Sequence, residues 1–79
     1  MTITEIYKEL KETRDCIKVD IDYCSTQLED ATLTQLERFS IEKKQAFEIG
    51  EYDAYTSILF MIEMSGLLEK EESNNEKDE

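Results

Sequence analysis

The sequence contains no Pro, no His and no Trp, and its only glycines are Gly50 and Gly66. Turn-rich β architectures depend on Gly and Pro, so the composition gives them little support. The chain has 79 residues, 37% of them charged. A chain of this length forms one small domain with a modest core. We therefore expect an all-α protein that relies on a partner or a second copy for part of its stability.

Strong metal ligands are scarce. Because His is absent, Cys16 and Cys24 are the only thiol or imidazole ligands, whereas a tetrahedral zinc site takes about four such ligands. If both cysteines lie on one helix, they are roughly 12 Å apart along its axis, which is too far for a disulfide. The sequence therefore predicts no metal, no cofactor and two free thiols. Free thiols are typical of a reducing environment, so we expect a cytoplasmic protein.

The groups that most catalytic sites use are also missing. The sequence has no Gly-rich phosphate loop and no nucleophile beside a recognisable base. Asp20 and Asp22 start like an EF-hand loop, but Ser25 stands where Gly is required and Ala31 where Glu is required. No charged-then-apolar leader opens the chain, and the longest apolar run, Ile58 to Ile62, is too short to cross a bilayer. We expect a protein that is not an enzyme and does not enter a membrane.

The charge is strongly negative. Asp and Glu number 20 against 9 Lys and Arg, which gives a net charge of −11. Such a surface repels phosphate, so direct binding to nucleic acid is disfavoured. The same field attracts basic protein surfaces and accelerates encounters with them. An ordinary alternative stays open, in which the charge only keeps a small protein soluble.

A long first helix is predicted from Thr2 to about Glu29. Thr2 and Glu5 have capping-box spacing, and apolar residues then recur in steps of four and three with only Arg14 interrupting them. These residues are Ile3, Tyr7, Leu10, Ile17, Ile21, Cys24 and Leu28. Residues 17–23 also alternate between apolar and polar, which is the period of a strand. Helix is favoured there because a lone strand would have no pairing partner.

The pattern resets near Asp30. Asp30 or Thr32 can cap a second helix, and Thr32 with Gln35 has capping-box spacing. A second helix is predicted to end at Gly50, since Gly suits the left-handed residue that terminates helices. The segment from Ala46 to Ala54 resembles the turn of a tetratricopeptide repeat, but no second copy of it is present. We interpret it as a common helix–Gly–helix turn.

A third helix is predicted from about Tyr52 to Leu68. The five consecutive apolar residues from Ile58 to Ile62 cover every direction around a helix, so more than one side must be covered by protein. The residues assigned to the core or to a homodimer interface are Tyr55, Ile58, Leu59, Phe60, Met61, Ile62, Met64 and Leu67. The expected fold is a small three-helix bundle, or a helical hairpin with a long first helix. We expect a dimer, with a helical domain over residues 1–70 and a disordered acidic tail over 71–79.

The leading hypothesis is a small acidic inhibitor or adaptor that blocks a basic, nucleic-acid-binding surface of a partner protein. In size, charge and helix content the chain resembles the inhibitors that phages make against host nucleases, restriction systems or CRISPR effectors, although no motif carries that resemblance. The carboxylates expected to meet the partner are Glu5, Glu9, Glu12, Asp20, Asp22, Glu29, Asp30, Glu48, Glu51 and Asp53. The alternatives are a helical homo-oligomeric assembly module and a protein that binds a transcription regulator.

Overall fold

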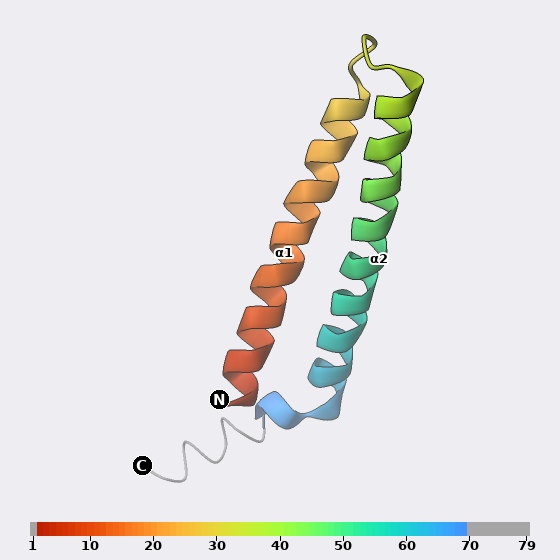
Figure 1. The fold of residues 1–79 in the computed structure, drawn as a ribbon. Coiled ribbons are helices and arrows are strands. Elements are labelled where there is room, and N and C mark those ends of the chain that lie inside the picture. Colours follow the sequence, from red (N-terminus) through yellow and green to blue (C-terminus); the bar gives the residue numbers. More distant parts are fainter. Residues whose placement is uncertain (1, 70–79) are drawn as a thin grey trace.

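The computed structural model describes residues 2–69 of the chain. Helix α1 spans Ile3–Leu28 and helix α2 spans Gln35–Ser65. The two helices form an antiparallel hairpin, with the start of α1 and the end of α2 at the same end of the molecule (Figure 1). A short helical segment at residues 67–69 follows α2, and no strand is present within residues 2–69. The expected all-α hairpin with a long first helix is confirmed, and the predicted tail at 71–79 lies outside the described residues.

Helix α1 starts where the sequence predicts. The Thr2 hydroxyl oxygen accepts a hydrogen bond from the backbone N–H of Glu5 at 3.1 Å, which satisfies one of the free donors of the first turn. Residues 17–23 are helical, so the alternative of a strand is excluded. Ile21 is buried while Val19 and Tyr23 are exposed. The inward face is therefore set by steps of three and four residues and not by alternation.

The prediction that a helix ends at Gly50 is wrong. Helix α2 continues through Gly50, and the predicted third helix is its second half. The left-handed terminating glycine is Gly66, at φ 75°. A glycine inside a helix costs about 0.8–1 kcal/mol relative to Ala, and the packing of α2 against α1 on both sides of Gly50 offsets this cost. The likeness to a repeat turn therefore corresponds to no turn in the structure.

The N-terminus of α2 also differs from the prediction by two residues. Thr34, not Thr32, is the N-cap, and it forms a complete capping box with Glu37. The Thr34 hydroxyl accepts from the Glu37 backbone N–H at 3.1 Å, and the Glu37 carboxylate accepts from the Thr34 backbone N–H at 3.2 Å. Both bonds satisfy donors that the helix end would otherwise leave free.

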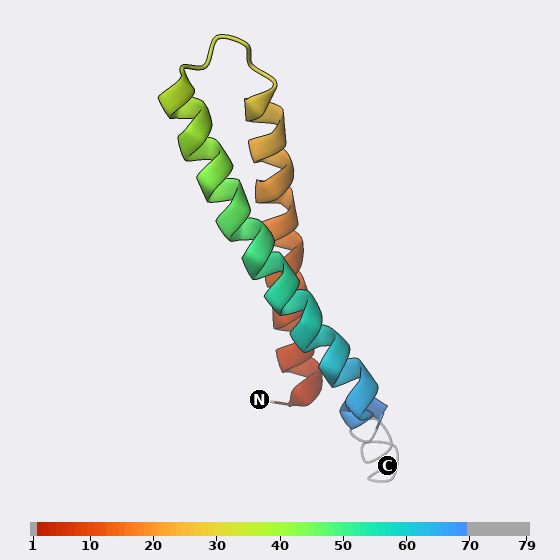
Figure 2. The same ribbon diagram turned by 90° about the vertical axis from the view of Figure 1, so that its right-hand side faces the viewer.

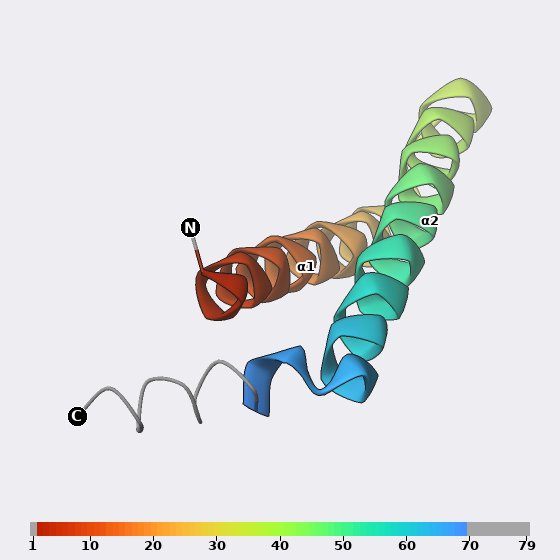
Figure 3. The ribbon, with the colours of Figure 1, turned by 90° about the horizontal axis from the view of Figure 1, so that it is seen from below.

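A heptad-like seam joins the helices. The inward residues of α2 follow steps of three and four residues, as the predicted seam of α1 does. They are Arg38, Ile41, Gln45, Glu48, Tyr52, Tyr55, Leu59 and Ile62. Figure 2 shows α2 crossing over α1, and Figure 3 shows from below that the two axes are inclined to each other.

The core of this hairpin is small. Within residues 2–69 its buried apolar side chains are Ile21, Cys24 and Leu59, and of these Cys24 and Leu59 are fully enclosed. Polar contacts supplement it, because the Gln45 amide donates to the Ile21 carbonyl at 3.0 Å and to the Ser25 hydroxyl at 2.7 Å. A core of this size supplies little stability to a chain on its own.

Candidate protein-binding surfaces

The outer side of α1 carries a row of carboxylates. One turn of helix holds about 3.6 residues, so side chains half a turn from the inward seam point away from α2. Glu5, Glu9 and Glu12 lie on this side, and Asp20 lies between it and the seam, three residues after Ile17 and four before Cys24. All four carboxylates are exposed. We call this set the acidic face, and it comprises Glu5, Glu9, Glu12 and Asp20.

The acidic face keeps most of its negative charge. Within residues 2–69 the ion pairs of α1 are Arg14–Asp15 and Lys18–Asp22, and neither involves a member of the face. Lys8 lies at its edge and is exposed. Tyr23 and Val19 extend the same side of the helix and are also exposed. The surface therefore combines uncompensated carboxylates with an aromatic and an aliphatic side chain, a composition suited to contact with a basic protein surface.

The remaining predicted carboxylates are dispersed. Asp22 is paired with Lys18 at 3.0 Å, and Glu29 is the C-cap of α1. Glu51 is half-buried and Asp53 is exposed on α2. Because α2 is continuous here, Glu51 is a neighbour of the buried Glu48, whereas Asp53 lies on another side of the helix, so the three carboxylates do not form one exposed cluster.

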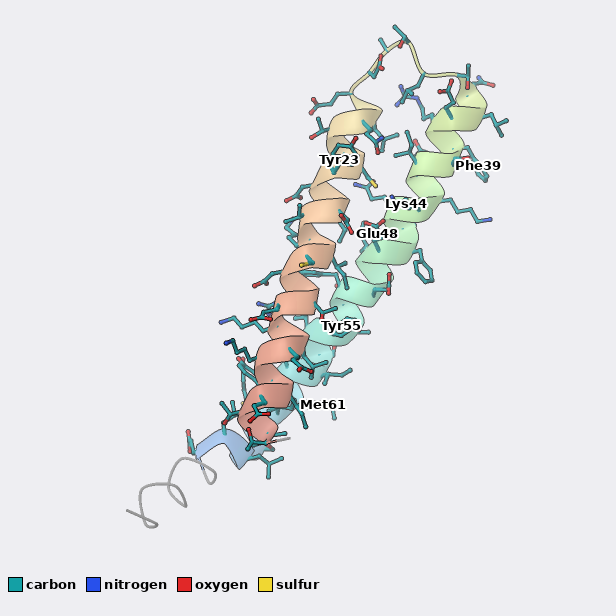
Figure 4. All side chains as sticks on the ribbon, turned by 60° about the vertical axis from the view of Figure 1, so that its left-hand side comes forward. Tyr23, Phe39, Lys44, Glu48, Tyr55 and Met61 are labelled. Carbon is teal, nitrogen blue, oxygen red and sulfur yellow. The ribbon has the colours of Figure 1, made fainter. Side chains whose placement is uncertain are left out.

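Glu48 lies inside the hairpin and not on its surface. Its exposed fraction is 7%, and Figure 4 shows it between the two helices. One carboxylate oxygen is 3.8 Å from the Lys44 ammonium, and the other has no hydrogen-bond partner among residues 2–69. A carboxylate placed this way cannot meet a partner, and its burial with so little compensation opposes folding.

The outer side of α2 is apolar. Large apolar side chains occupy it along the whole helix, and each of them is exposed. Figure 4 shows Phe39 on the side of α2 turned away from α1. Ala46, Gly50 and Ala54 lie on the same side between these larger groups. We call this surface the apolar face, and its large members are Leu36, Phe39, Phe47, Ile58, Met61 and Met64.

The predicted core or interface residues divide between the two sides of α2. Leu59 is buried, and Tyr55 and Ile62 are half-buried in the seam against α1. The others are exposed, and they are Ile58, Phe60, Met61, Met64 and Leu67. Sequence reasoning missed that Leu36, Phe39 and Phe47 continue the same exposed face. The signal was present in their helical spacing, but the prediction of a turn at Gly50 separated the two halves.

Two further contacts involve titratable groups. The Tyr7 hydroxyl donates a hydrogen bond to the Glu63 carboxylate, which links the open ends of the hairpin. This bond to Glu63 raises the pKa of the Tyr7 phenol above its ordinary value. In the connection between the helices, Asp30 accepts from the backbone N–H and the hydroxyl of Thr32, at 2.9 and 2.7 Å. These bonds lower the pKa of the Asp30 carboxyl below its ordinary 3.8.

The lowered pKa of Asp30 gives a prediction about acid stability. Because the folded pKa lies below the unfolded one, the contribution of the carboxylate is complete above 3.8 and is lost as the pH falls through the folded pKa. Asp30→Asn keeps a hydrogen-bond acceptor but cannot titrate. The difference in free energy of unfolding between the natural chain and Asp30→Asn should be constant above about pH 5 and change below that. Urea unfolding followed by circular dichroism measures it, and a difference independent of pH would contradict the assignment.

The described residues offer no enclosed site for a small molecule. Residues 2–69 contain no pocket and no group of three or more side chains placed to hold a metal ion. Neither α1 nor α2, the long helices of this part of the chain, is apolar enough to cross a membrane.

The fold and these faces define an antiparallel helical hairpin with one acidic and one apolar outer side. A comparison with protein-family models, curated proteins and solved structures finds no match to this chain.

Proposed function

We propose that this chain is a non-catalytic binding protein that occupies a basic, nucleic-acid-binding surface of a partner through the acidic face of α1. The observation that carries the proposal is the position of Glu5, Glu9, Glu12 and Asp20. Glu5, Glu9 and Glu12 share the side of α1 turned away from α2, Asp20 flanks it, and no ion pair within residues 2–69 neutralises any of the four. The activity would be inhibition or bridging, in which carboxylates take the place of phosphates on the partner's Lys and Arg side chains.

Helical geometry supports this arrangement. Glu5 and Glu9 are four residues apart, and Glu9 and Glu12 are three apart, so the side chains are neighbours on one surface. Like charges at this spacing destabilise an isolated helix slightly. A basic partner would relieve that repulsion and would be drawn in by the field. The resemblance to phage-encoded inhibitors remains a hypothesis about the kind of target.

Two variants of equal charge test the role of the acidic face. The first neutralises three of its members, in Glu9→Gln, Glu12→Gln and Asp20→Asn. The matched control neutralises Glu29, Glu42 and Asp53, which are exposed elsewhere. Both sets remove the same charge, so a general effect of net charge would weaken binding equally. We expect the first set to weaken binding about tenfold or more at low salt and the control set to have a much smaller effect.

The binding measurement uses the basic partner recovered by affinity capture from the source cells and identified by mass spectrometry. Anisotropy of a labelled nucleic acid bound to that partner reports competition by the chain across a salt series. Competition should weaken as salt rises, and less steeply for the first variant set. Recovery of no basic partner would contradict the proposal, as would affinity independent of salt or equal weakening by the two sets.

A second candidate function rests on the apolar face of α2. In this reading the chain is a helical assembly module, and its negative charge serves solubility. A charged residue at Met61 should then abolish function, whereas the neutralised acidic face should leave it intact. The opposite pair of results would favour the inhibitor.

A further inference from the structure

The apolar face of α2 is too extensive to be explained by the hairpin alone. Its six large side chains are exposed along the whole length of a 31-residue helix, while three apolar residues form the buried core of the described chain. Exposed apolar patches of this extent mark interaction sites. We propose that a second copy of the chain covers this face, with the two α2 helices antiparallel and Gly50 of each copy at the two-fold axis.

Gly50 is the observation that selects this geometry. It lies in the interior of α2 without a positive φ, and a Cβ added to it would meet nothing within 4 Å. The hairpin therefore gives no reason for a residue that weakens a helix. Ala46 and Ala54 stand four residues to either side of it, on the same face. Small residues in this spacing let the backbone of another helix approach closely.

A two-fold axis at Gly50 pairs four of the six large members of the face with one another, whereas it places Phe47 opposite Asp53 and Ile58 opposite Glu42 of the second copy. A two-fold axis at this position places Phe39 opposite Met61 of the second copy, and Leu36 opposite its Met64. Helices that cross are closest at the crossing point and diverge toward their ends. Apart from Phe47, the side chains of the face are small at the centre and large toward both ends, which suits that shape. An interface that pairs one patch with itself is the arrangement that two-fold dimers require.

The area is also sufficient for a specific dimer. A large apolar or aromatic side chain buries about 150–250 Å² when it is fully covered. Covering the exposed parts of the six side chains on both copies would remove on the order of 1,000–1,500 Å² from water. Specific interfaces bury roughly 1,200–2,000 Å² in total.

The distribution of charge permits a second copy on this face. Lys43 is the charged member of this side of α2. In the dimer it would stand opposite Ser57 of the second copy. Because Ser is small and the Lys side chain is long, the ammonium group can still reach solvent. Both acidic faces would remain on the outside, far from the shared axis, which limits repulsion between two chains of charge −11. An anionic bilayer would be repelled by that charge. The chain's own residues 70–79 include no apolar residue to cover the face.

Sedimentation analysis of the full chain over a concentration series tests the association. Met61→Lys and Val19→Lys are matched variants, since the two side chains are 68% and 65% exposed in the hairpin and lie on opposite outer sides. We expect a dimer for the natural chain and for Val19→Lys, and at least about tenfold weaker association for Met61→Lys. A monomer at every concentration would overturn the proposal, as would equal association of the two variants or equal loss in both.

Gly50→Leu provides a variant in which folding and association change in opposite directions. Leu is a better helix former than Gly, so helix content measured by circular dichroism at low concentration should be equal or higher. The new side chain would separate the helices at the axis, so the dissociation constant of the dimer should rise about tenfold or more. Unchanged or tighter association of this variant would overturn the placement of Gly50 at the axis.

Cross-linking determines the direction of the helices. In a Cys16→Ser background, Gly50→Cys should form a disulfide between copies under mild oxidation because the two positions meet. Phe39→Cys alone should not, since the two copies of residue 39 would be about 33 Å apart. A cross-link from Phe39→Cys would indicate parallel helices, in which every residue meets its own copy, and would overturn the proposal, as would the absence of a cross-link from Gly50→Cys. This inference concerns α2 alone, so it stands or falls separately from the binding proposed for the acidic face of α1.

Discussion

Leu59→Ala should remove most of the stability of this hairpin. Leu59 is 1% exposed and lies in the seam of α2. Truncating a buried Leu to Ala typically costs about 2–5 kcal/mol, and small domains often have little more than that in total. We therefore expect a large fall in the free energy of unfolding, measured by urea titration followed by circular dichroism. The protein concentration must be held constant, because any association would add to the measured stability.

The control for Leu59→Ala is the neighbouring Phe60→Ala. Phe is the larger side chain, but Phe60 is 59% exposed, so less of its apolar surface leaves water on folding. Its truncation should cost much less than that of Leu59. If Phe60→Ala proved as damaging as Leu59→Ala, then α2 would be rotated from the orientation that buries Leu59.

Glu48→Leu should stabilise the protein. The natural carboxylate is 7% exposed, with a single ion pair of 3.8 Å and one oxygen without a partner among residues 2–69. Replacing a buried charge of this kind with an apolar group of similar volume is often stabilising, by about 1–4 kcal/mol. For a domain of this size, each kcal/mol corresponds to about 4–8 °C in Tm. Thermal unfolding should show a rise of at least about 4 °C.

Glu9→Leu serves as the matched control for Glu48→Leu. Glu9 is exposed on the outer side of α1, where the same substitution buries nothing and should leave Tm nearly unchanged. Equal effects of the two substitutions would mean that helix propensity, and not the buried position, is responsible. A fall in Tm for Glu48→Leu would show that the Glu48 carboxylate is needed inside the hairpin.

Local sequence determined the type of structure and most of α1. The absence of Pro and the scarcity of Gly favoured helices over turn-rich β structure. The steps of three and four residues from Ile3 to Leu28 identified the inward face of α1, including Ile21 and Cys24. Thr2 was recognised as an N-cap because capping depends on residues only three positions apart. The spacing of Glu5, Glu9 and Glu12 likewise placed them on one side of a helix. All of these properties follow from interactions within about two turns of the chain.

Gly50, Glu48 and the run from Ile58 to Ile62 required the tertiary structure. A glycine is compatible with a helix end and with a helix interior, and only packing along α1 decides between them. Glu48 was predicted to lie on the surface because a carboxylate usually does, but its place in the seam buries it. Five consecutive apolar residues point in all directions, and only the position of α1 selects Leu59 for the core and leaves Met61 outside. The sequence determined that this chain forms long helices, and the contact between the two helices decided which side of each remains free to bind.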